Sequence, residues 1–128
     1  MRILPWLMDH TGGPVLYRIG RAGRLTVVGR SSGSLRTTMC QFRARPDGTI
    51  VIGSREGRQW PANVAAAGRC RFEAHGRPAR DFSATILEGP ARAAAIAELA
   101  GSPDGRGASF YSGNVFELRP APQPAPSA

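Results

Sequence analysis

The sequence has no lysine, and it has only a few cysteines and histidines, two residue types that would help to identify a function. All 17 of its basic residues are arginine, against 9 acidic residues, so the formal net charge is +8. Two cysteines are too few for a disulfide scaffold, and the two histidines have no neighbours at metal-ligand spacing. The charge favours an anionic partner, whether a nucleic acid, a membrane surface or a phosphorylated cofactor, without choosing among them.

Long hydrophobic runs and targeting signals are absent as well. The apolar stretch at residues 3–8, ILPWLM, ends at Asp9, whereas a membrane-spanning helix needs about 20 apolar residues. No charged segment leads into an apolar core of the kind that a secretory signal requires. We therefore expect a cytoplasmic protein that at most touches a membrane surface weakly through its N-terminus.

The residue patterns of common catalytic sites are also missing. No serine lies in the G-x-S-x-G setting of a hydrolase, and no two carboxylates have a spacing that indicates general acid–base chemistry. Cys40 and Cys70 fall at inward strand positions and are interpreted as buried thiols. Most arginines are scattered rather than interleaved with aromatic residues, which argues against a nucleic-acid platform.

Alternating hydrophobicity predicts a small, mainly β (α+β) protein. Six short strands are expected at residues 25–29, 38–45, 49–53, 69–75, 82–87 and 114–119, with helices at 61–67 and 90–100. Cys40, Phe42 and Ile86 are predicted to face inward and Gln41 outward, with strand 49–53 buried on both faces. Closure into a barrel of mostly antiparallel strands removes exposed edges, and an open α+β sheet is the alternative. The domain is placed at residues 1–119, followed by a disordered Pro/Ala tail at 120–128.

One motif, GRSSGSLR at residues 29–36, follows the first strand directly. Its glycines let backbone N–H groups converge, its serines add neutral donors, and Arg30 and Arg36 carry guanidinium groups that fork onto phosphate or carboxylate oxygens. The same composition is typical of an ordinary hairpin turn. Taken alone, the motif leaves both interpretations open.

A second motif, SREGRQWPAN at residues 54–63, runs from a buried strand into a helix N-terminus, which favours negative charge. In this motif Trp60 offers a ring for a ligand to lie against, with Ser54 and Asn63 placed to hydrogen-bond its edges. The alternative is a helix-capping segment with one structural tryptophan.

Together, in this order, the two motifs resemble the deazaflavin-dependent nitroreductase family. Residues 29–36 match the G-x-x-S-G-x-x-R part of its signature, with Met39-Cys40 where the family has Pro-Leu. Residues 54–57 look like its S-x-G-G turn, and residues 60–66 look like its W-x-x-N-L-x-A segment. The resemblance implies a split β-barrel and an enzyme that uses the reduced deazaflavin coenzyme F420 to transfer hydride to a small electron-poor acceptor, such as a quinone, enone or nitro compound.

The resemblance also implies a cofactor site, a substrate contact and a homodimer. Phosphate and the acidic tail of the cofactor would be held by Arg30, Ser32, Gly33, Arg36 and Thr37. The ring would be surrounded by Thr38, Ser54, Arg55, Gly57, Trp60 and Asn63. Tyr111 is the candidate for contact with the substrate, and no metal is expected. The alternatives are an FMN-binding or cofactor-sequestering barrel without turnover, and a basic module that binds nucleic acid.

Overall fold

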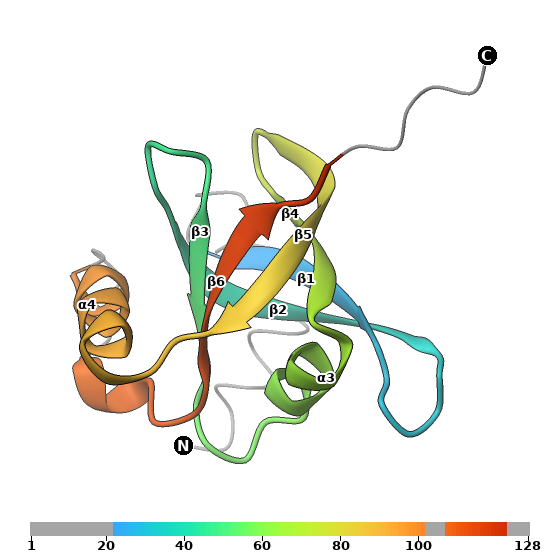
Figure 1. The fold of residues 1–128 in the computed structure, drawn as a ribbon, viewed down its shortest axis with the longest axis horizontal. Helices are drawn as coiled ribbons and strands as arrows, with labels where there is room; N and C mark the ends of the chain where they lie inside the picture. The colour runs from blue at the N-terminus through green and yellow to red at the C-terminus, as the bar shows by residue number, and fades with distance from the viewer. Residues whose placement is uncertain (1–21, 102–106, 123–128) are drawn as a thin grey trace.

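Six antiparallel strands form a closed barrel in the computed structural model, which describes residues 22–101 and 107–122 (Figure 1). The strands are β1 (Ala22–Val28), β2 (Leu35–Ala44), β3 (Ile50–Gly53), β4 (Arg69–Ala74), β5 (Arg77–Ile86) and β6 (Val115–Pro120). They follow one another around the barrel in the order β1-β2-β3-β6-β5-β4, and β1 closes the ring by pairing with both β2 and β4. The predicted mainly β barrel is confirmed, and the open-sheet alternative is wrong.

Helices occupy the two longest connections between strands. Helix α3 (Trp60–Ala67) links β3 to β4, and α4 (Gly89–Ala100) with the short 3-10 helix η2 (Ala108–Phe110) lies between β5 and β6. A proline in its first turn and the left-handed Gly68 (φ 68°) delimit α3, as its sequence predicted. In the described part of the chain, no helix is long and apolar enough to cross a membrane.

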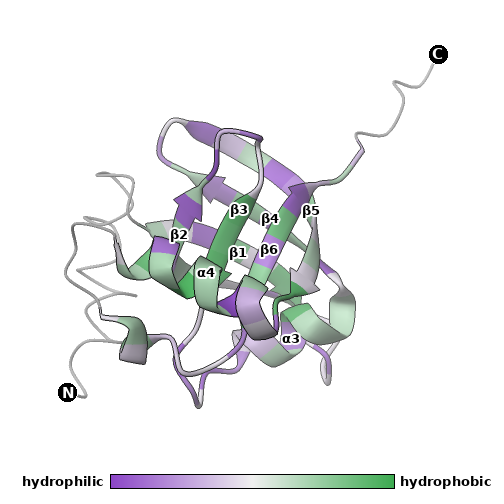
Figure 2. Ribbon diagram, turned by 60° about the vertical axis from the view of Figure 1, so that its left-hand side comes forward, coloured by the Kyte–Doolittle hydropathy of each residue, from purple (hydrophilic) through white to green (hydrophobic). Residues whose placement is uncertain are grey.

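The core fills the barrel and continues beneath α4. Cys70, Phe72 and Ala74 alternate into the barrel interior, as the pattern of β4 predicted. Strand β3 is buried on both faces because its neighbours on the two sides are different. Ile50 and Ile52 belong to the barrel core, whereas Val51 belongs to a second cluster with α4. Figure 2 shows β3 coloured as hydrophobic, with α4 packed in front of the same sheet.

Two predicted strand faces need correction. Gln41, expected to face solvent, is only 6% exposed, because its Oε1 accepts a 2.6 Å hydrogen bond from the buried Tyr111 hydroxyl. Ile86, expected in the core, is 40% exposed. It pairs with the buried Phe116, so its direction was right. It is nevertheless the last residue of β5, where the barrel ends and covers it only in part.

Strand β6 reaches the segment that was assigned to the C-terminal tail. Pro120 is its last residue and pairs with Phe82, and the N–H of Ala121 donates to the carbonyl of Asp81 at 3.0 Å. The ordered chain therefore continues slightly beyond the boundary predicted at residue 119. The apolar stretch at residues 3–8 and the end of the tail, residues 123–128, lie outside the described residues.

Antiparallel connectivity separates the connections into two ends of the barrel. The β1–β2 turn, α3 and the segment between β5 and β6 lie at one end, which we call the helix end. The β2–β3 and β4–β5 turns lie at the other, which we call the turn end. Figure 1 shows α3 and the β2–β3 turn at opposite sides of the view. Both predicted motifs belong to the helix end.

Candidate functional site

The β1–β2 turn, residues 29–34, is shaped by its own hydrogen bonds. The N–H of Gly29 donates to the carbonyl of Ser34 at 2.7 Å, and the N–H of Gly33 donates to that of Gly29 at 2.9 Å. Gly33 has φ 72°, a left-handed conformation that favours glycine. Ser32 Oγ accepts a 3.2 Å bond from the N–H of Ser34. The predicted loop is present, although β2 begins at Leu35, inside the motif.

Several donors of this turn remain available. The backbone N–H groups of Ser31 and Ser32 have no acceptor among the described residues. All residues from Arg30 to Arg36 are exposed. The Arg36 side chain lies beside the turn, with its Nε about 3.3 Å from the position that a Cβ on Gly29 would occupy. N–H groups without an acceptor in a turn beside an arginine are donors of the kind that bind anions.

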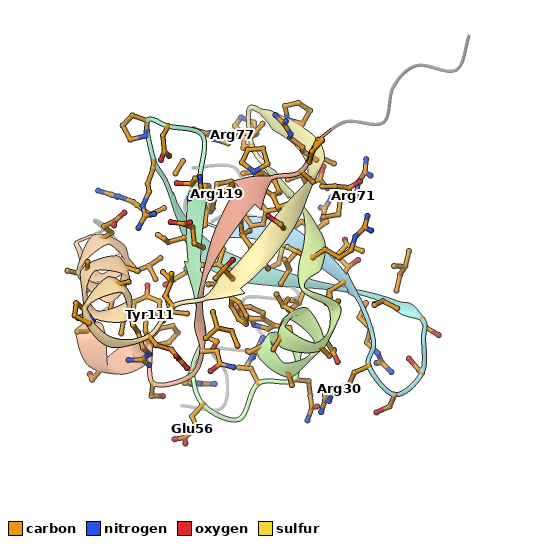
Figure 3. All side chains as sticks on the ribbon, viewed as in Figure 1. Arg30, Glu56, Arg71, Arg77, Tyr111 and Arg119 are labelled. Atoms are coloured by element: carbon orange, nitrogen blue, oxygen red, sulfur yellow. The ribbon has the colours of Figure 1, made fainter. Side chains whose placement is uncertain are left out.

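A three-residue contact joins this turn to helix α3. Asn63 Oδ1 accepts bonds from the backbone N–H of Arg30 at 3.1 Å and from Arg30 Nη1 at 2.8 Å. Arg30 Nη2 donates to Gln59 Oε1 at 3.2 Å. Figure 3 shows Arg30 beside α3. The structure thus places the two sequence motifs in direct contact, across 33 positions of the chain.

The segment before α3 is tied to the loop that precedes β6. The Ser54 hydroxyl donates to the carbonyl of Asn114 at 2.8 Å, and the N–H of Gly113 donates to the carbonyl of Ser54 at 2.9 Å. The N–H of Glu56 donates to Ser112 Oγ at 3.1 Å. Gly57, with φ 89°, turns the chain toward α3. These bonds fix the outward path of residues 55–58.

Three of the predicted ligand contacts instead face inward. Trp60 is 7% exposed and belongs to the barrel core, with its ring centroid 6.0 Å from that of Phe116. Ser54 and Asn63 are 3% and 5% exposed, and both already have hydrogen-bond partners. The Trp60 ring is therefore not exposed in this structure, and the predicted contacts of Trp60, Ser54 and Asn63 with a ligand ring stay predictions. These residues form the support behind the surface.

Tyr111, the expected substrate contact, is 2% exposed. Its ring lies against Phe110 and within the cluster beneath α4, and its hydroxyl donates to Gln41. The side chain is therefore buried in this structure, and its contact with a substrate stays a prediction. The structure gives Tyr111 a packing role between α4 and β2.

Threonines of β2 complete the exposed surface. Thr37 is exposed, and its hydroxyl shares a 3.1 Å hydrogen bond with that of Thr26 across the β1–β2 hairpin. Thr38 is half-buried, one position further into the strand. Thr38 shares the strand face of Arg36, whereas Thr37 lies on the opposite face beside Thr26.

Three arginines at this end have no ion-pair partner among the described residues, although the acidic Glu56 lies between Arg55 and Arg58 in the sequence. Arg36, Arg55 and Arg58 form no ion pair with any described carboxylate. The ion pairs of the described residues lie elsewhere on the barrel: Arg24–Glu73, Arg45–Glu98, Arg45–Glu117, Arg71–Asp81 and Arg119–Glu117. Unpaired guanidinium groups raise the potential for an anion at the helix end.

Two residues of this surface were not assigned from the sequence, namely Arg58 and Gln59. Gln59 stands at the N-cap of α3 without capping it, because its side chain instead accepts from Arg30. Arg58 lies near enough to β2 that its charge lowers the pKa of the Cys40 thiol, against the larger effects of burial and of Cys70. In the sequence, Gln59 could have been identified as a polar residue that directly precedes the helix and is not one of the usual capping residues.

The thiols inside the barrel are inert by environment. Burial raises the pKa of Cys40 far above its ordinary value, with Cys70 adding to the effect. Burial, followed by the charge of Asp81, raises the pKa of Cys70 to about 12. A protonated, buried thiol is a poor nucleophile. Among the described residues, no three histidine, cysteine or acidic side chains gather as metal ligands would.

Solved structures provide a comparison where sequence matching does not. No family model and no curated protein matches this sequence. Structurally, the chain is similar to an F420-H2 dependent reductase, FDR-A, with a TM-score of 0.61 and 18% identity, over 77% of this chain and 94% of that one. The two share a fold. The chain is a split β-barrel.

Other solved structures with similar TM-scores belong to proteins that are named for other functions. The heme storage protein HutZ from Vibrio cholerae has a TM-score of 0.63 and 14% identity, over 91% of this chain and 93% of that one. A putative pyridoxamine 5'-phosphate oxidase from Listeria innocua has a TM-score of 0.58 and 13% identity, over 85% and 90%. The predicted split-barrel fold is thereby confirmed, and a protein of the kind that the sequence resembles stands among its neighbours.

Proposed function

We propose that this split barrel is a deazaflavin-dependent oxidoreductase that transfers hydride from reduced F420 to a small electron-poor acceptor. The observation that carries the proposal is the contact between Arg30 and Asn63, which joins the two motifs of the family resemblance into one surface. A neighbour named as an F420-H2 dependent reductase supports it further. The acceptor is a quinone, an enone or a nitro compound.

The donor set of the helix end suits the anionic part of this cofactor. The free N–H groups of Ser31 and Ser32 and the guanidinium of Arg36 match phosphate and carboxylate oxygens, and the Ser32 hydroxyl and Gly33 complete the turn. Arg30 holds the turn against α3 through Asn63 and Gln59, and its side chain is exposed. An arginine-rich surface is well matched to several carboxylates at once.

Other residues border the place proposed for the ring. We assign Thr37 and Thr38 on β2, with Arg55 and Gly57 on the segment before α3, to its margin. Ser54, Trp60 and Asn63 support that margin from inside. When bound, the deazaflavin supplies the hydride. The protein's task is to orient the ring and the acceptor and to exclude water, which requires no acid–base residue of its own.

A binding titration tests the proposal. Purified protein titrated with oxidised F420 is expected to change the coenzyme's fluorescence and to saturate. Replacing Arg36 with alanine, alone and together with Arg30→Ala, is expected to weaken binding by about tenfold or more, because each replacement removes charged hydrogen bonds. No change in fluorescence at micromolar protein would overturn the proposal.

A matched control separates this site from general electrostatics. The double variant Arg43→Ala/Arg69→Ala removes the same charge from two exposed strand positions outside the proposed site. It is expected to bind F420 as the unaltered protein does. Thermal melting followed by circular dichroism checks that both double variants remain folded.

The same titration distinguishes the alternatives. Saturable binding of FMN in place of F420 indicates a flavin-binding barrel. Binding of F420 without acceptor reduction in single-turnover experiments indicates sequestration. Hemin is a further probe, because the neighbour HutZ is named as a heme storage protein. Preference for nucleic acid, with steep loss of affinity as salt rises, would indicate a basic binding module.

We further propose that the barrel forms a homodimer through the exposed part of β2. Among the described residues, β2 pairs with β3 only at residues 42–44, so the edge of residues 35–41 facing away from β1 has no partner strand. Leu35 there is 76% exposed, and Val28 across the turn is 39% exposed. An unpaired edge with exposed apolar residues is a natural place for a second chain.

A further inference from the structure

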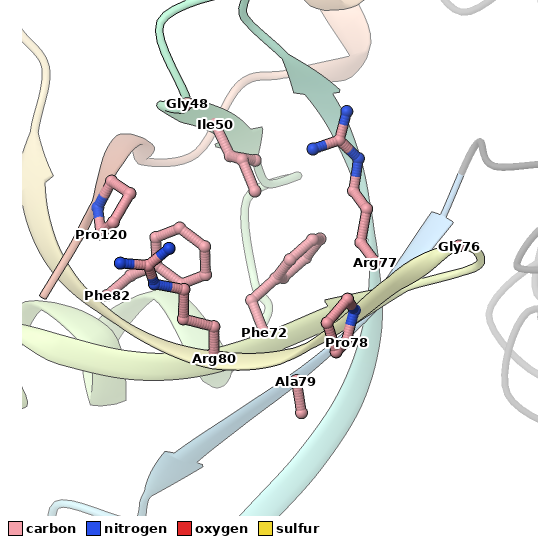
Figure 4. Close-up of a pocket in the computed structure, with 10 residues that line it drawn as sticks. All are labelled: Gly48, Ile50, Phe72, Gly76, Arg77, Pro78, Ala79, Arg80, Phe82 and Pro120. Carbon is pink, nitrogen blue, oxygen red and sulfur yellow. The ribbon is translucent and has the colours of Figure 1, made fainter. Parts of the chain in front are cut away.

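A pocket opens at the turn end of the barrel, away from the site proposed above. It has a volume of about 510 Å³, within the range of small-molecule sites. Figure 3 shows Arg77, which lines it, far from Arg30 of the helix end. Ten residues line the pocket: Gly48, Ile50, Phe72, Gly76, Arg77, Pro78, Ala79, Arg80, Phe82 and Pro120 (Figure 4).

The floor of the pocket is apolar and rigid. Ile50, Phe72 and Phe82 are each 5% exposed or less and belong to the barrel core. The rings of Phe72 and Phe82 meet edge to face with centroids 6.4 Å apart, and Phe42 packs against Phe72 at 5.1 Å. Such a floor offers a preformed surface to an aliphatic or aromatic group.

The rim carries two arginines that a β-bulge turns toward the barrel interior. Opposite residues of an antiparallel pair share a face, and Phe72 pairs with Arg80 while Ala74 pairs with Arg77. Both β4 residues face inward. Two steps along β4 therefore match three along β5, and this extra residue brings Arg77 and Arg80 onto the same face. Without the bulge, alternation would place the two arginines on opposite faces.

These arginines are unpaired although acids are available nearby. None of the ten lining residues is acidic, and neither Arg77 nor Arg80 forms an ion pair with a described carboxylate. Arg71 on the neighbouring strand pairs with Asp81, the residue next to Arg80. Figure 4 shows the two guanidinium groups on either side of the pocket, with the rings of Phe72 and Phe82 between them.

From this combination we infer that the pocket binds a small amphipathic anion. The apolar body of the ligand lies on Ile50, Phe72 and Phe82, and a single carboxylate or phosphate head is held by one of the two rim arginines, Arg77 or Arg80. Arginine forks onto either head group, and the apolar floor disfavours a charge on the body of the ligand. The site is distinct from the proposed cofactor surface and does not depend on it.

Matched eight-carbon probes test this inference. Titration calorimetry of the full chain is expected to give saturable binding of octanoate or octyl phosphate, and the comparison of the two identifies the preferred head group. Octanol lacks the charge, and its affinity is expected to be lower than that of the preferred anion by about tenfold or more. The backbone amide signals of Gly48 and Gly76, which line the pocket, are expected to shift on addition of the anion.

Variants assign the binding to the two arginines. Arg77→Ala/Arg80→Ala is expected to lower the affinity for the preferred anion by about tenfold or more, and Arg77→Glu/Arg80→Glu to shift preference to octylammonium. Arg43→Ala/Arg69→Ala, with the same loss of charge, and Arg30→Ala/Arg36→Ala are expected to bind octanoate normally. Failure of both anions to bind the full chain, or equal weakening in the three alanine pairs, would overturn the inference.

Discussion

Asn63 joins the two halves of the proposed site, although its side chain is almost entirely buried. Replacing it with leucine keeps much of its volume but removes the acceptor of two hydrogen bonds from Arg30. We expect the free energy of unfolding to fall by about 1–3 kcal/mol, since a donor loses its partner in a part-buried place. Urea denaturation measures this change. Gln59→Ala removes only an exposed bond to Arg30, and its expected loss is within about 0.5 kcal/mol.

The buried thiols make stability depend on pH in the alkaline range. In the folded protein, burial raises the pKa of Cys70 from 9.0 to about 12 and raises that of Cys40 further. The unfolded chain releases these protons near pH 9.0, so folding keeps a proton that the unfolded state loses. The stabilisation from Cys70 is complete below pH 9.0 and is lost as pH rises toward 12.

Denaturation on both sides of pH 9.0 checks this sign. The unaltered protein is expected to lose stability as pH rises, and Cys40→Val/Cys70→Val is expected to lose less, because the double variant lacks both thiols. The two thiols are expected to react with iodoacetamide only after unfolding. Rapid labelling of the folded protein at neutral pH would contradict the burial of both side chains.

At the scale of elements, α4 is held to the barrel by Arg45. Its Nε and Nη2 donate to both carboxylate oxygens of Glu98 at 3.0 and 2.9 Å, and its Nη1 donates to Glu117 at 2.6 Å. Glu98→Gln is expected to lower the free energy of unfolding by about 1 kcal/mol, near the upper limit for partly exposed pairs, because the contact is bidentate. Hydrogen exchange is expected to accelerate in α4 but not in β4.

A weaker ion pair on the same barrel serves as the comparison. Glu73 accepts one bond from Arg24, whose side chain is 49% exposed. Glu73→Gln is therefore expected to cost only a few tenths of a kcal/mol. A double-mutant cycle between Arg45 and Glu98 isolates their interaction from other effects of each substitution. A coupling energy no larger than that of Arg24 with Glu73 would refute the tethering role.

Local sequence patterns predicted the elements well because alternation depends on neighbours only two residues away. The inward positions of β4 and the stop of α3 at Gly68 are of this kind. The burial of Gln41 could not be predicted from alternation, because its hydrogen-bond partner, Tyr111, lies 70 positions away in the chain. The bulge in β5 was equally hidden, since it appears only in the register with β4.

The candidate site also has parts that local sequence predicted and parts that depend on distant packing. The turn at residues 29–34 was predictable from its glycines and serines, which set its conformation locally. Trp60 was assigned to a ligand through the family resemblance, with a structural tryptophan as the alternative, and the structure packs its ring into the barrel core. The direction of a side chain at such a position depends on packing against strands that are distant in the sequence. The residues near that position in the sequence do not reveal this packing.

At the scale of the whole molecule, the unpaired edge of β2 predicts how two copies assemble. Leu35 is 76% exposed beside this edge, and a glutamate there places charge where a second chain would pack. We expect sedimentation velocity to show a dimer for the unaltered protein and a monomer for Leu35→Glu. Ile86→Glu introduces the same charge at a 40% exposed position on β5 and is expected to leave the dimer intact. A monomer at all concentrations, or equal dissociation in both variants, would mean that the edge of β2 does not form the interface.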